Sequence, residues 1–201
     1  MRIDPESRAL SGLTTFLTFV ALNLLYLVLC LPVITIGAAT SALYEVTIRY
    51  SDDESGHPLK DFLPAFRADF GRATLAMLCL LAPAVLLAYS SVFWFAMPSI
   101  LGGAAGIVAV LGALYLFAAF LYGMAQVAYL RAPLRQTLKN SLLLPAAEPA
   151  RTLGVVLIPV ALVAFTILFP PFGFILLTVG FSVGAYATAF LFRSVFARHQ
   201  S

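Results

Sequence analysis

The chain has 201 residues, of which 62% are hydrophobic and only 10% are charged, and its net charge is +3. A soluble domain carries about 25% charged residues. This composition therefore excludes a disordered chain, an ordinary soluble enzyme and a solvent-exposed nucleic-acid binder, and it indicates a protein whose main solvent is lipid.

The uncharged stretches predict the number of membrane crossings. No Asp, Glu, Lys or Arg occurs in 9–44, 73–130 or 152–192. A helix needs about 20 apolar residues to cross a hydrocarbon core roughly 30 Å thick, so each stretch has room for two helices and a turn. Proline and glycine break each stretch where that turn is required. The sequence predicts an all-α polytopic membrane protein, a single integral domain over 1–201 with six transmembrane helices arranged as three hairpins. The expected helices are 12–31, 34–50, 73–97, 102–130, 153–169 and 173–193.

The first expected hairpin holds most of the candidate functional residues. Asn23 is the only strongly polar amide well inside helix 12–31, and it either joins helices by a hydrogen bond or contacts a solute. The turn from Pro32 through Thr35 to Gly37 either simply connects two helices or lines a ligand cavity, as broken helices do in some transporters. Both interpretations stay open for each feature.

Glu45 is the only acidic residue inside an apolar helix, which makes it a functional candidate. Arg49 follows four residues later, in the order that favours a helical ion pair. The alternatives are a shallow ion pair near the cytoplasmic end and a group coupled to ion or proton movement.

Two segments between the hairpins, 49–72 and 131–151, are expected to form short amphipathic cytoplasmic helices. One carries aromatic residues at intervals of four, and the other carries basic residues at the same interval. Such helices lie in the membrane interface or dock a cytoplasmic partner. The candidate lipid or partner contacts are Phe62, Phe66, Arg67, Phe70, Arg131, Arg135 and Lys139.

The basic residues also predict an orientation. All 12 Lys and Arg lie in the N-terminal segment, in 49–72, in 131–151 and in the C-terminal tail. Because Lys and Arg concentrate in cytoplasmic loops, both termini are expected in the cytoplasm. The apolar run after Arg8 is too long for the core of a secretory signal, so we expect helix 12–31 to be retained.

Several runs resemble a known family. They are Asn23-Leu24-Leu25-Tyr26, Leu31-Pro32-Val33-Ile34-Thr35-Ile36-Gly37-Ala38-Ala39, Ala42-Leu43-Tyr44, Lys60-Asp61-Phe62, Phe66-Arg67-Ala68-Asp69-Phe70 and Leu138-Lys139-Asn140-Ser141-Leu142. The chain resembles the YesL family of bacterial membrane proteins, which has no established biochemical activity. The resemblance implies a bacterial plasma-membrane location and an association with carbohydrate transport. It implies no catalytic residues.

The motifs of membrane enzymes and nucleotide-driven pumps are missing. The sequence has no G-x-x-x-x-G-K-[ST] motif and only two histidines, both outside the expected helices. We expect no enzymatic activity, no cofactor, no metal and no nucleic-acid partner. The favoured function is an accessory or scaffold component linked to carbohydrate transport or sensing, and the alternative is a small oligomeric solute transporter or channel. The expected partners are the lipid bilayer, a carbohydrate transporter or cytoplasmic protein, and a second copy of the chain.

Overall fold

A computed structural model describes residues 5–53, 57–130 and 132–199. In this part of the chain every regular element is a helix. The elements are α1 (Pro5–Cys30), the 3-10 turn η1 (Val33–Thr35), α2 (Ile36–Asp53), α3 (Pro58–Ala68), α4 (Phe70–Phe95), α5 (Ile100–Leu130), α6 (Leu134–Ala147), α7 (Pro149–Leu168), α8 (Phe172–Ile175), the π-helical turn η2 (Leu176–Gly180) and α9 (Phe181–His199).

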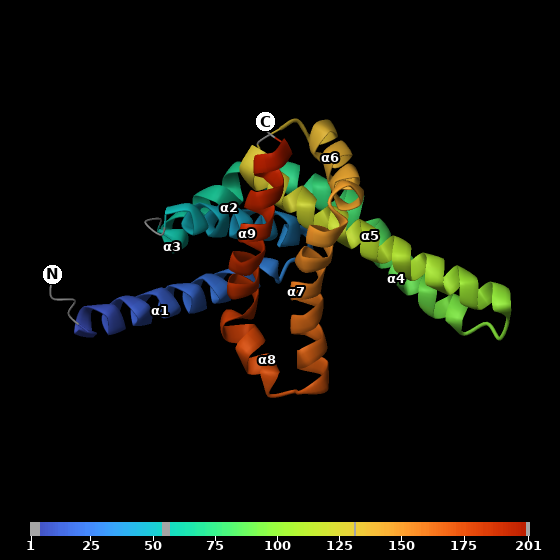
Figure 1. The fold of residues 1–201 in the computed structure, drawn as a ribbon, viewed down its shortest axis with the longest axis horizontal. Coiled ribbons are helices and arrows are strands. Elements are labelled where there is room, and N and C mark those ends of the chain that lie inside the picture. Colours follow the sequence, from blue (N-terminus) through green and yellow to red (C-terminus); the bar gives the residue numbers. More distant parts are fainter. Residues whose placement is uncertain (1–4, 54–56, 131, 200–201) are drawn as a thin grey trace.

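Three arms diverge from a central hub (Figure 1). Helix α1 points to one side, the α4–α5 hairpin points to the other, and the α7–α9 hairpin runs roughly across both. The hub consists of α2 and the C-terminal halves of α5 and α9, with α3 and α6 packed around them. Its largest buried side chains include Tyr122, Phe192 and Met124, so the apolar core lies at the hub rather than along the arms.

Within the described residues, five segments are long and apolar enough to cross a membrane. They are Gly12–Cys30, Phe70–Phe95, Ile100–Leu130, Pro149–Leu168 and Phe172–Arg198. A membrane location is therefore plausible for this chain. The predicted six-helix hairpin arrangement is not confirmed, because the helix expected over 34–50 is not among these segments. That helix, α2, also carries Glu45, Arg49 and Asp52, and its residues 37–44 are buried by protein.

The turn between α1 and α2 lies beside the first turns of α4. The Gly37 N–H donates to the Met77 sulfur at 3.1 Å, and the Thr74 hydroxyl lies 3.4 Å from the Ile34 carbonyl oxygen. Glycine is required here, since a Cβ on Gly37 would lie 2.6 Å from the Ala73 carbonyl oxygen. The structure thus places this turn beside Ala73, the residue that directly follows the basic residue Arg72.

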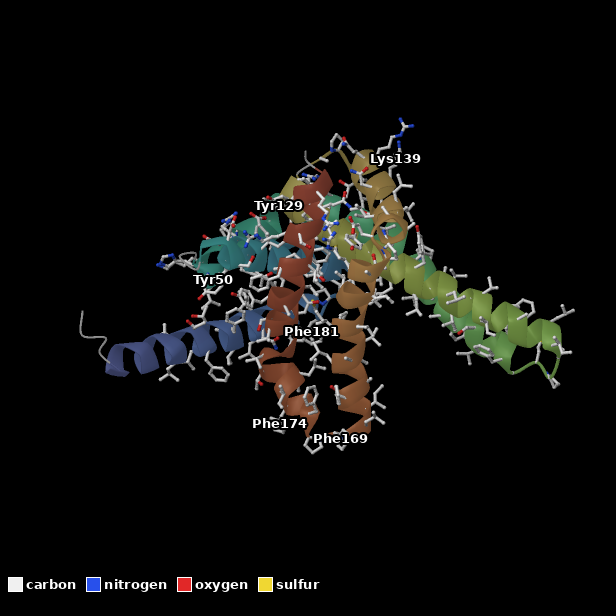
Figure 2. All side chains as sticks on the ribbon, in the orientation of Figure 1. Tyr50, Tyr129, Lys139, Phe169, Phe174 and Phe181 are labelled. Carbon is white, nitrogen blue, oxygen red and sulfur yellow. The ribbon has the colours of Figure 1, made fainter. Side chains whose placement is uncertain are left out.

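Charged groups gather at the hub, while the α4–α5 arm and the far ends of α7 and α8 expose carbon (Figure 2). Two arginines tie hub segments together. Arg72 donates to the Ala132 carbonyl at 2.8 Å, and Arg193 donates to the Ser51 carbonyl at 2.7 Å. A hydrogen bond from a charged donor to a backbone carbonyl is stronger than one from a neutral donor. These two bonds therefore hold α4 to the segment before α6 and α9 to α2.

Candidate functional site

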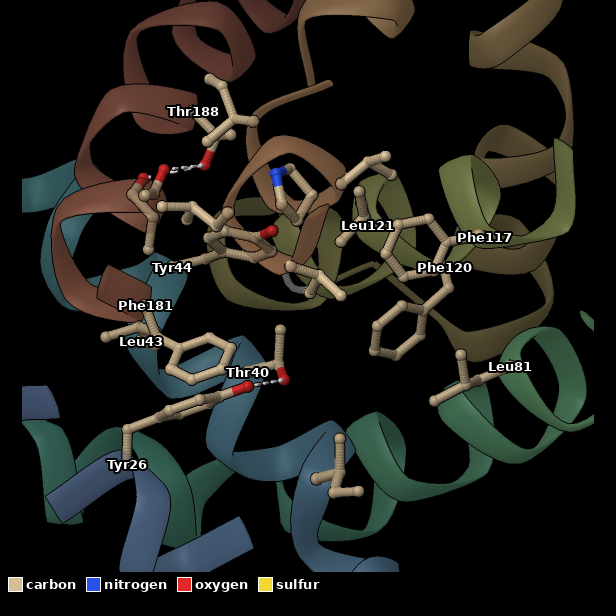
Figure 3. A pocket seen from close by; sticks show the side chains of 18 of the residues that line it. Tyr26, Thr40, Leu43, Tyr44, Leu81, Phe117, Phe120, Leu121, Phe181 and Thr188 are labelled. Atoms are coloured by element: carbon tan, nitrogen blue, oxygen red, sulfur yellow. Dashed lines mark hydrogen bonds between the residues drawn. The ribbon is translucent and has the colours of Figure 1, made fainter. Parts of the chain in front are cut away.

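A large cavity in the described part of the chain lies beside the hub, between the α4–α5 and α7–α9 hairpins. Its volume is about 570 Å³, and α2 and the end of α1 complete its wall. Ile158 to Ile167 of α7 contribute one side. Helices α1, α2, α4, α5 and α9 form the rest of the wall. The side chains from these helices that Figure 3 labels are Tyr26, Thr40, Leu43, Tyr44, Leu81, Phe117, Phe120, Leu121, Phe181 and Thr188.

Four hydroxyl groups are the main polar features of this wall, and they are largely engaged within the protein. The Tyr26 and Thr40 hydroxyls are 3.3 Å apart (Figure 3). Thr188 donates to carbonyl oxygens of its own helix at 2.9 and 3.1 Å. Burial raises the pKa of the Tyr44 phenol above its ordinary value, so that group stays neutral. No charged residue lines the cavity, and its chemistry suits an apolar or weakly polar group such as an acyl chain or a helix side chain.

Asn23 joins α1 to the π-helical turn before α9. Its side-chain Nδ2 donates to the carbonyl oxygens of Leu176 and Leu177 at 3.3 and 2.7 Å, and its Oδ1 accepts from the N–H groups of Phe181 and Ser182 at 2.9 and 3.0 Å. A π-helical turn disrupts the regular backbone ladder, and the amide occupies donors and acceptors on both sides of this turn. The structure therefore places Asn23 as an interhelical link that is buried and fully engaged.

The side chain of Thr35 holds the Pro32–Gly37 turn together by hydrogen bonds to backbone carbonyls. The Thr35 hydroxyl contacts the carbonyl oxygen of Leu29, in the last turn of α1, and that of Pro32, which also accepts from the Thr35 N–H at 2.9 Å. Pro32 is exposed before η1, and Gly37 is buried against α4. None of these three residues lines the large cavity, so the structure does not join them to Tyr26, Thr40 or Tyr44 in one site.

Glu45 and Arg49 form the ion pair that their spacing predicts. Arg49 Nη2 lies 2.6 Å from Glu45 Oε1, and Arg49 Nη1 lies 3.5 Å from Asp61 Oδ2 of α3. The Glu45 side chain is only 10% exposed, whereas that of Arg49 is 53% exposed. The pair therefore sits at the edge of the hub and links α2 to α3.

The aromatic residues of the first amphipathic segment have different surroundings. Phe62 is completely buried in the hub core, Phe66 is half-buried, and Phe70 is 38% exposed. Our interpretation of Phe62 as a lipid or partner contact is corrected, because no partner can reach it. Asp69 separates α3 from α4 with a non-helical backbone, so Phe70 begins a new helix beside the exposed Arg67.

The second amphipathic segment forms α6. Arg135 and Lys139 are exposed on it, where they can meet lipid headgroups. Arg131 falls outside the described residues, so the structure has no bearing on its predicted contact.

Gln126 is a polar residue whose importance the sequence left undecided. It is completely buried in α5, and its Nε2 donates to the Ser141 hydroxyl of α6 at 3.2 Å. The available signal was a lone amide in the long uncharged stretch 73–130. The partner on α6 could not be foreseen, because it depends on how the two helices pack.

Within the described ranges, no group of three or more His, Cys, Asp or Glu side chains comes close enough to hold a metal ion. The ion pairs lie at the hub, and the hydroxyls of the large cavity are not accompanied by a histidine, lysine or carboxylate in its wall. Among the described residues of this wall, none is of a type that activates a nucleophile by accepting its proton.

Comparison with known proteins yields one family. The model of a family described as "Protein of unknown function, DUF624" matches residues 19–91. This range includes Asn23, the Pro32–Gly37 turn and the Glu45–Arg49 pair, and it ends within α4. No curated protein matches the chain, and no solved structure matches it. This region of the chain is therefore similar to a family of unknown function.

Proposed function

We propose that the chain is a non-enzymatic, multi-pass protein of the bacterial plasma membrane. In this proposal it acts as an accessory or scaffold component of a carbohydrate transport or sensing system, and other membrane proteins pack against its arms. The carbohydrate link rests on the sequence resemblance to the YesL family. The scaffold role rests on how the chain distributes its polar and apolar groups.

Most of the polar groups in and beside the hub that the structure describes make internal contacts. Asn23 makes four hydrogen bonds, Glu45 and Asp61 flank Arg49, and Arg193 contacts Ser51 and Asp52. A solute pathway through a membrane requires polar or charged side chains that face a water-filled route. The large cavity has an apolar wall instead, which disfavours the transporter alternative.

The arms expose the surface that a scaffold needs. Residues Leu86, Val108 and Leu111 of the α4–α5 hairpin are each more than half exposed, and Figure 1 shows this hairpin standing apart from α7 and α9. Helices associate in lipid when they find better packing than acyl chains provide. An arm that its own chain leaves unpacked offers that opportunity to a partner or to a second copy.

The orientation that we propose places the hub toward the cytoplasm, with both termini on that side. Because five segments are long and apolar enough to cross a membrane, the termini share a side only if one of these segments does not cross or if α2 crosses as well. Arg193 binds α2 within the hub, and Thr14 and Thr18 of α1 share a small cavity with His57 and Lys60. Residues 14–18 of α1 and the end of α9 therefore both lie near basic groups, which favour the cytoplasmic side.

Labelling of single cysteines tests this orientation in a Cys30→Ser, Cys79→Ser background. We expect a membrane-impermeant maleimide added to intact cells to modify Pro171→Cys, at the turn between α7 and α8. The same reagent should modify Gly12→Cys and Ala197→Cys only after the cells are permeabilised. Labelling of Ala197→Cys in intact cells would reverse the proposed orientation, and labelling of Gly12→Cys alone would place the termini on opposite sides.

Reconstitution tests the scaffold role against transport. The purified chain in liposomes should show no saturable uptake of radiolabelled sugars or ions, since its hub has no polar route. A photo-crosslinking residue at Leu111 should form adducts with a membrane subunit of a sugar uptake system in native membranes. The same residue at Gln136, exposed on α6, serves as the control. Saturable uptake that Glu45→Gln abolishes, or crosslinks at Leu111 to lipid alone, would contradict the scaffold proposal.

A further inference from the structure

A second pocket, at the hub end of the molecule, contains an acceptor without a partner. Gln126 is 0% exposed, and among the described residues no group donates to its Oε1. An unpaired buried acceptor costs about 1–3 kcal/mol. A native protein that keeps such an atom beside an open pocket commonly satisfies it with a molecule that the pocket admits.

The orientation of the Gln126 amide is set by its neighbour. The Ser141 hydroxyl donates its single proton to the Thr137 carbonyl at 2.6 Å. Its oxygen must therefore accept from Gln126, and the Nε2 atom of Gln126 is the donor at 3.2 Å. This chain of two hydrogen bonds directs Oε1 away from Ser141, and Gln126 itself lines the pocket.

The pocket lies between α5, α6 and α9 and has a volume of about 290 Å³, which exceeds the needs of one water molecule. Gln126 and Asn140 supply its amide groups, while Leu143, Leu144 and Phe196 supply much of its apolar wall. Leu143 is more than half exposed, so the apolar wall continues to the outer surface of α6. A ligand with a hydroxyl at one end and hydrocarbon at the other matches this lining.

The charges around the pocket are mainly positive. Helices α5, α6 and α9 contain no Asp or Glu, whereas α6 and α9 carry Arg135, Lys139, Arg193 and Arg198. The nearby acidic residues are paired: Asp52 of α2 contacts Arg193, and Glu148, which follows Ala147 of the lining, contacts Arg151. Such a surrounding disfavours an ammonium headgroup and favours an anion. Lys139 precedes Asn140 directly and is exposed, where it can meet a phosphate at the rim.

We propose that this pocket binds the headgroup of an anionic phospholipid that carries a headgroup hydroxyl. The hydroxyl donates to Gln126 Oε1, the Asn140 amide contacts the headgroup, and the acyl chains lie along Leu143 on the outside of α6. Phosphatidylglycerol has this chemistry, whereas phosphatidylethanolamine presents an ammonium group. The proposal is independent of the accessory role, because a scaffold and a transporter could each hold such a lipid.

Native mass spectrometry of the delipidated protein tests the site. The protein in non-ionic detergent receives equal amounts of phosphatidylglycerol and phosphatidylethanolamine, and the retained adducts are counted. We expect preferential retention of phosphatidylglycerol. In the Gln126→Leu variant the preference for phosphatidylglycerol should be about fivefold weaker, because one hydrogen bond of about 1 kcal/mol corresponds to about a fivefold change in affinity. Gln136→Leu, an equivalent change at an exposed position of α6, should retain it.

Two further measurements keep the test decisive. Free glycerol 3-phosphate should neither form an adduct nor displace phosphatidylglycerol, and displacement would assign the pocket to a soluble phosphate ester instead. Asn140→Leu, at a half-buried position, should also weaken the preference and serves if Gln126→Leu does not fold. Unchanged retention in both pocket variants would show that water satisfies Gln126, and the proposal would be wrong.

Discussion

Replacing Asn23 with leucine should lower the free energy of unfolding by about 2–4 kcal/mol, because four interhelical hydrogen bonds disappear and each contributes about 0.6 kcal/mol or more in a membrane protein. The substitution keeps the side chain's size, so the loss reports on polarity. The four backbone groups of η2 and α9 would remain buried without this partner. Unfolding in mixed detergent micelles, followed by circular dichroism, measures the change.

Thr178 provides the matched control for Asn23. It lies in the same π-helical turn, is exposed, and donates only to carbonyl oxygens of its own helix, Phe174 and Ile175, at 2.8 and 3.2 Å. Thr178→Val should therefore change stability by less than about 0.5 kcal/mol. If Asn23→Leu and Thr178→Val had equal effects, the interhelical link would not be a major source of stability.

Phe62→Ala should have the largest effect on stability, about 3–5 kcal/mol, because it removes a completely buried ring and leaves a cavity in the hub. Phe70→Ala removes the same ring at a 38% exposed position, and its cost should be well below that of Phe62→Ala. Chemical or thermal unfolding of both variants under identical conditions gives the comparison. Partner crosslinking through Leu111 should survive Phe70→Ala.

The opposite ranking would restore the original interpretation of the aromatic stripe. If Phe62→Ala unfolded like the wild type but abolished partner crosslinks, Phe62 would act at a surface. The stripe at intervals of four assumes a single continuous helix. Asp69 interrupts that helix, and the Phe66 and Phe70 rings nevertheless meet with centroids 5.5 Å apart. Periodicity finds an apolar face, but it does not say which of its residues the hub covers.

The hydropathy pattern predicts the helices well and their arrangement poorly. Long uncharged runs must satisfy their backbone groups internally, so helices follow from composition. Pro32, Pro98 and Pro170 mark turns between them, whereas Pro83 and Pro159 lie inside α4 and α7. Whether the helix over 34–50 faces lipid or is enclosed by protein depends instead on packing. Its small residues, from Gly37 to Ala42, suit a lipid-facing helix and a helix enclosed by protein equally well. The structure selects the second, through the close approach of Gly37 to α4.

The candidate site shows the same division between chemistry and geometry. An isolated amide such as Asn23 in an apolar helix predicts a hydrogen-bonded link, and the structure supplies one. Its partner, a π-helical turn more than 150 residues away, leaves no recognisable pattern in the sequence. Tyr44 and Thr188 likewise meet at the large cavity from α2 and α9, and only the folded chain brings them together.

The unequal lengths of the arms couple the cavity to the thickness of the bilayer. Helix α5 has 31 residues and is about 46 Å long, whereas α7 has 20 residues and is about 30 Å long, close to the thickness of a hydrocarbon core. Since the C-terminal half of α5 belongs to the hub, the longer hairpin matches the same slab by leaning or by continuing beyond it, and it does lean away from α7 and α9 (Figure 1). Lipids with longer chains favour a more upright α4–α5 hairpin. That movement would narrow the cavity between the hairpins, so the thickness of the bilayer would set the width of the cavity.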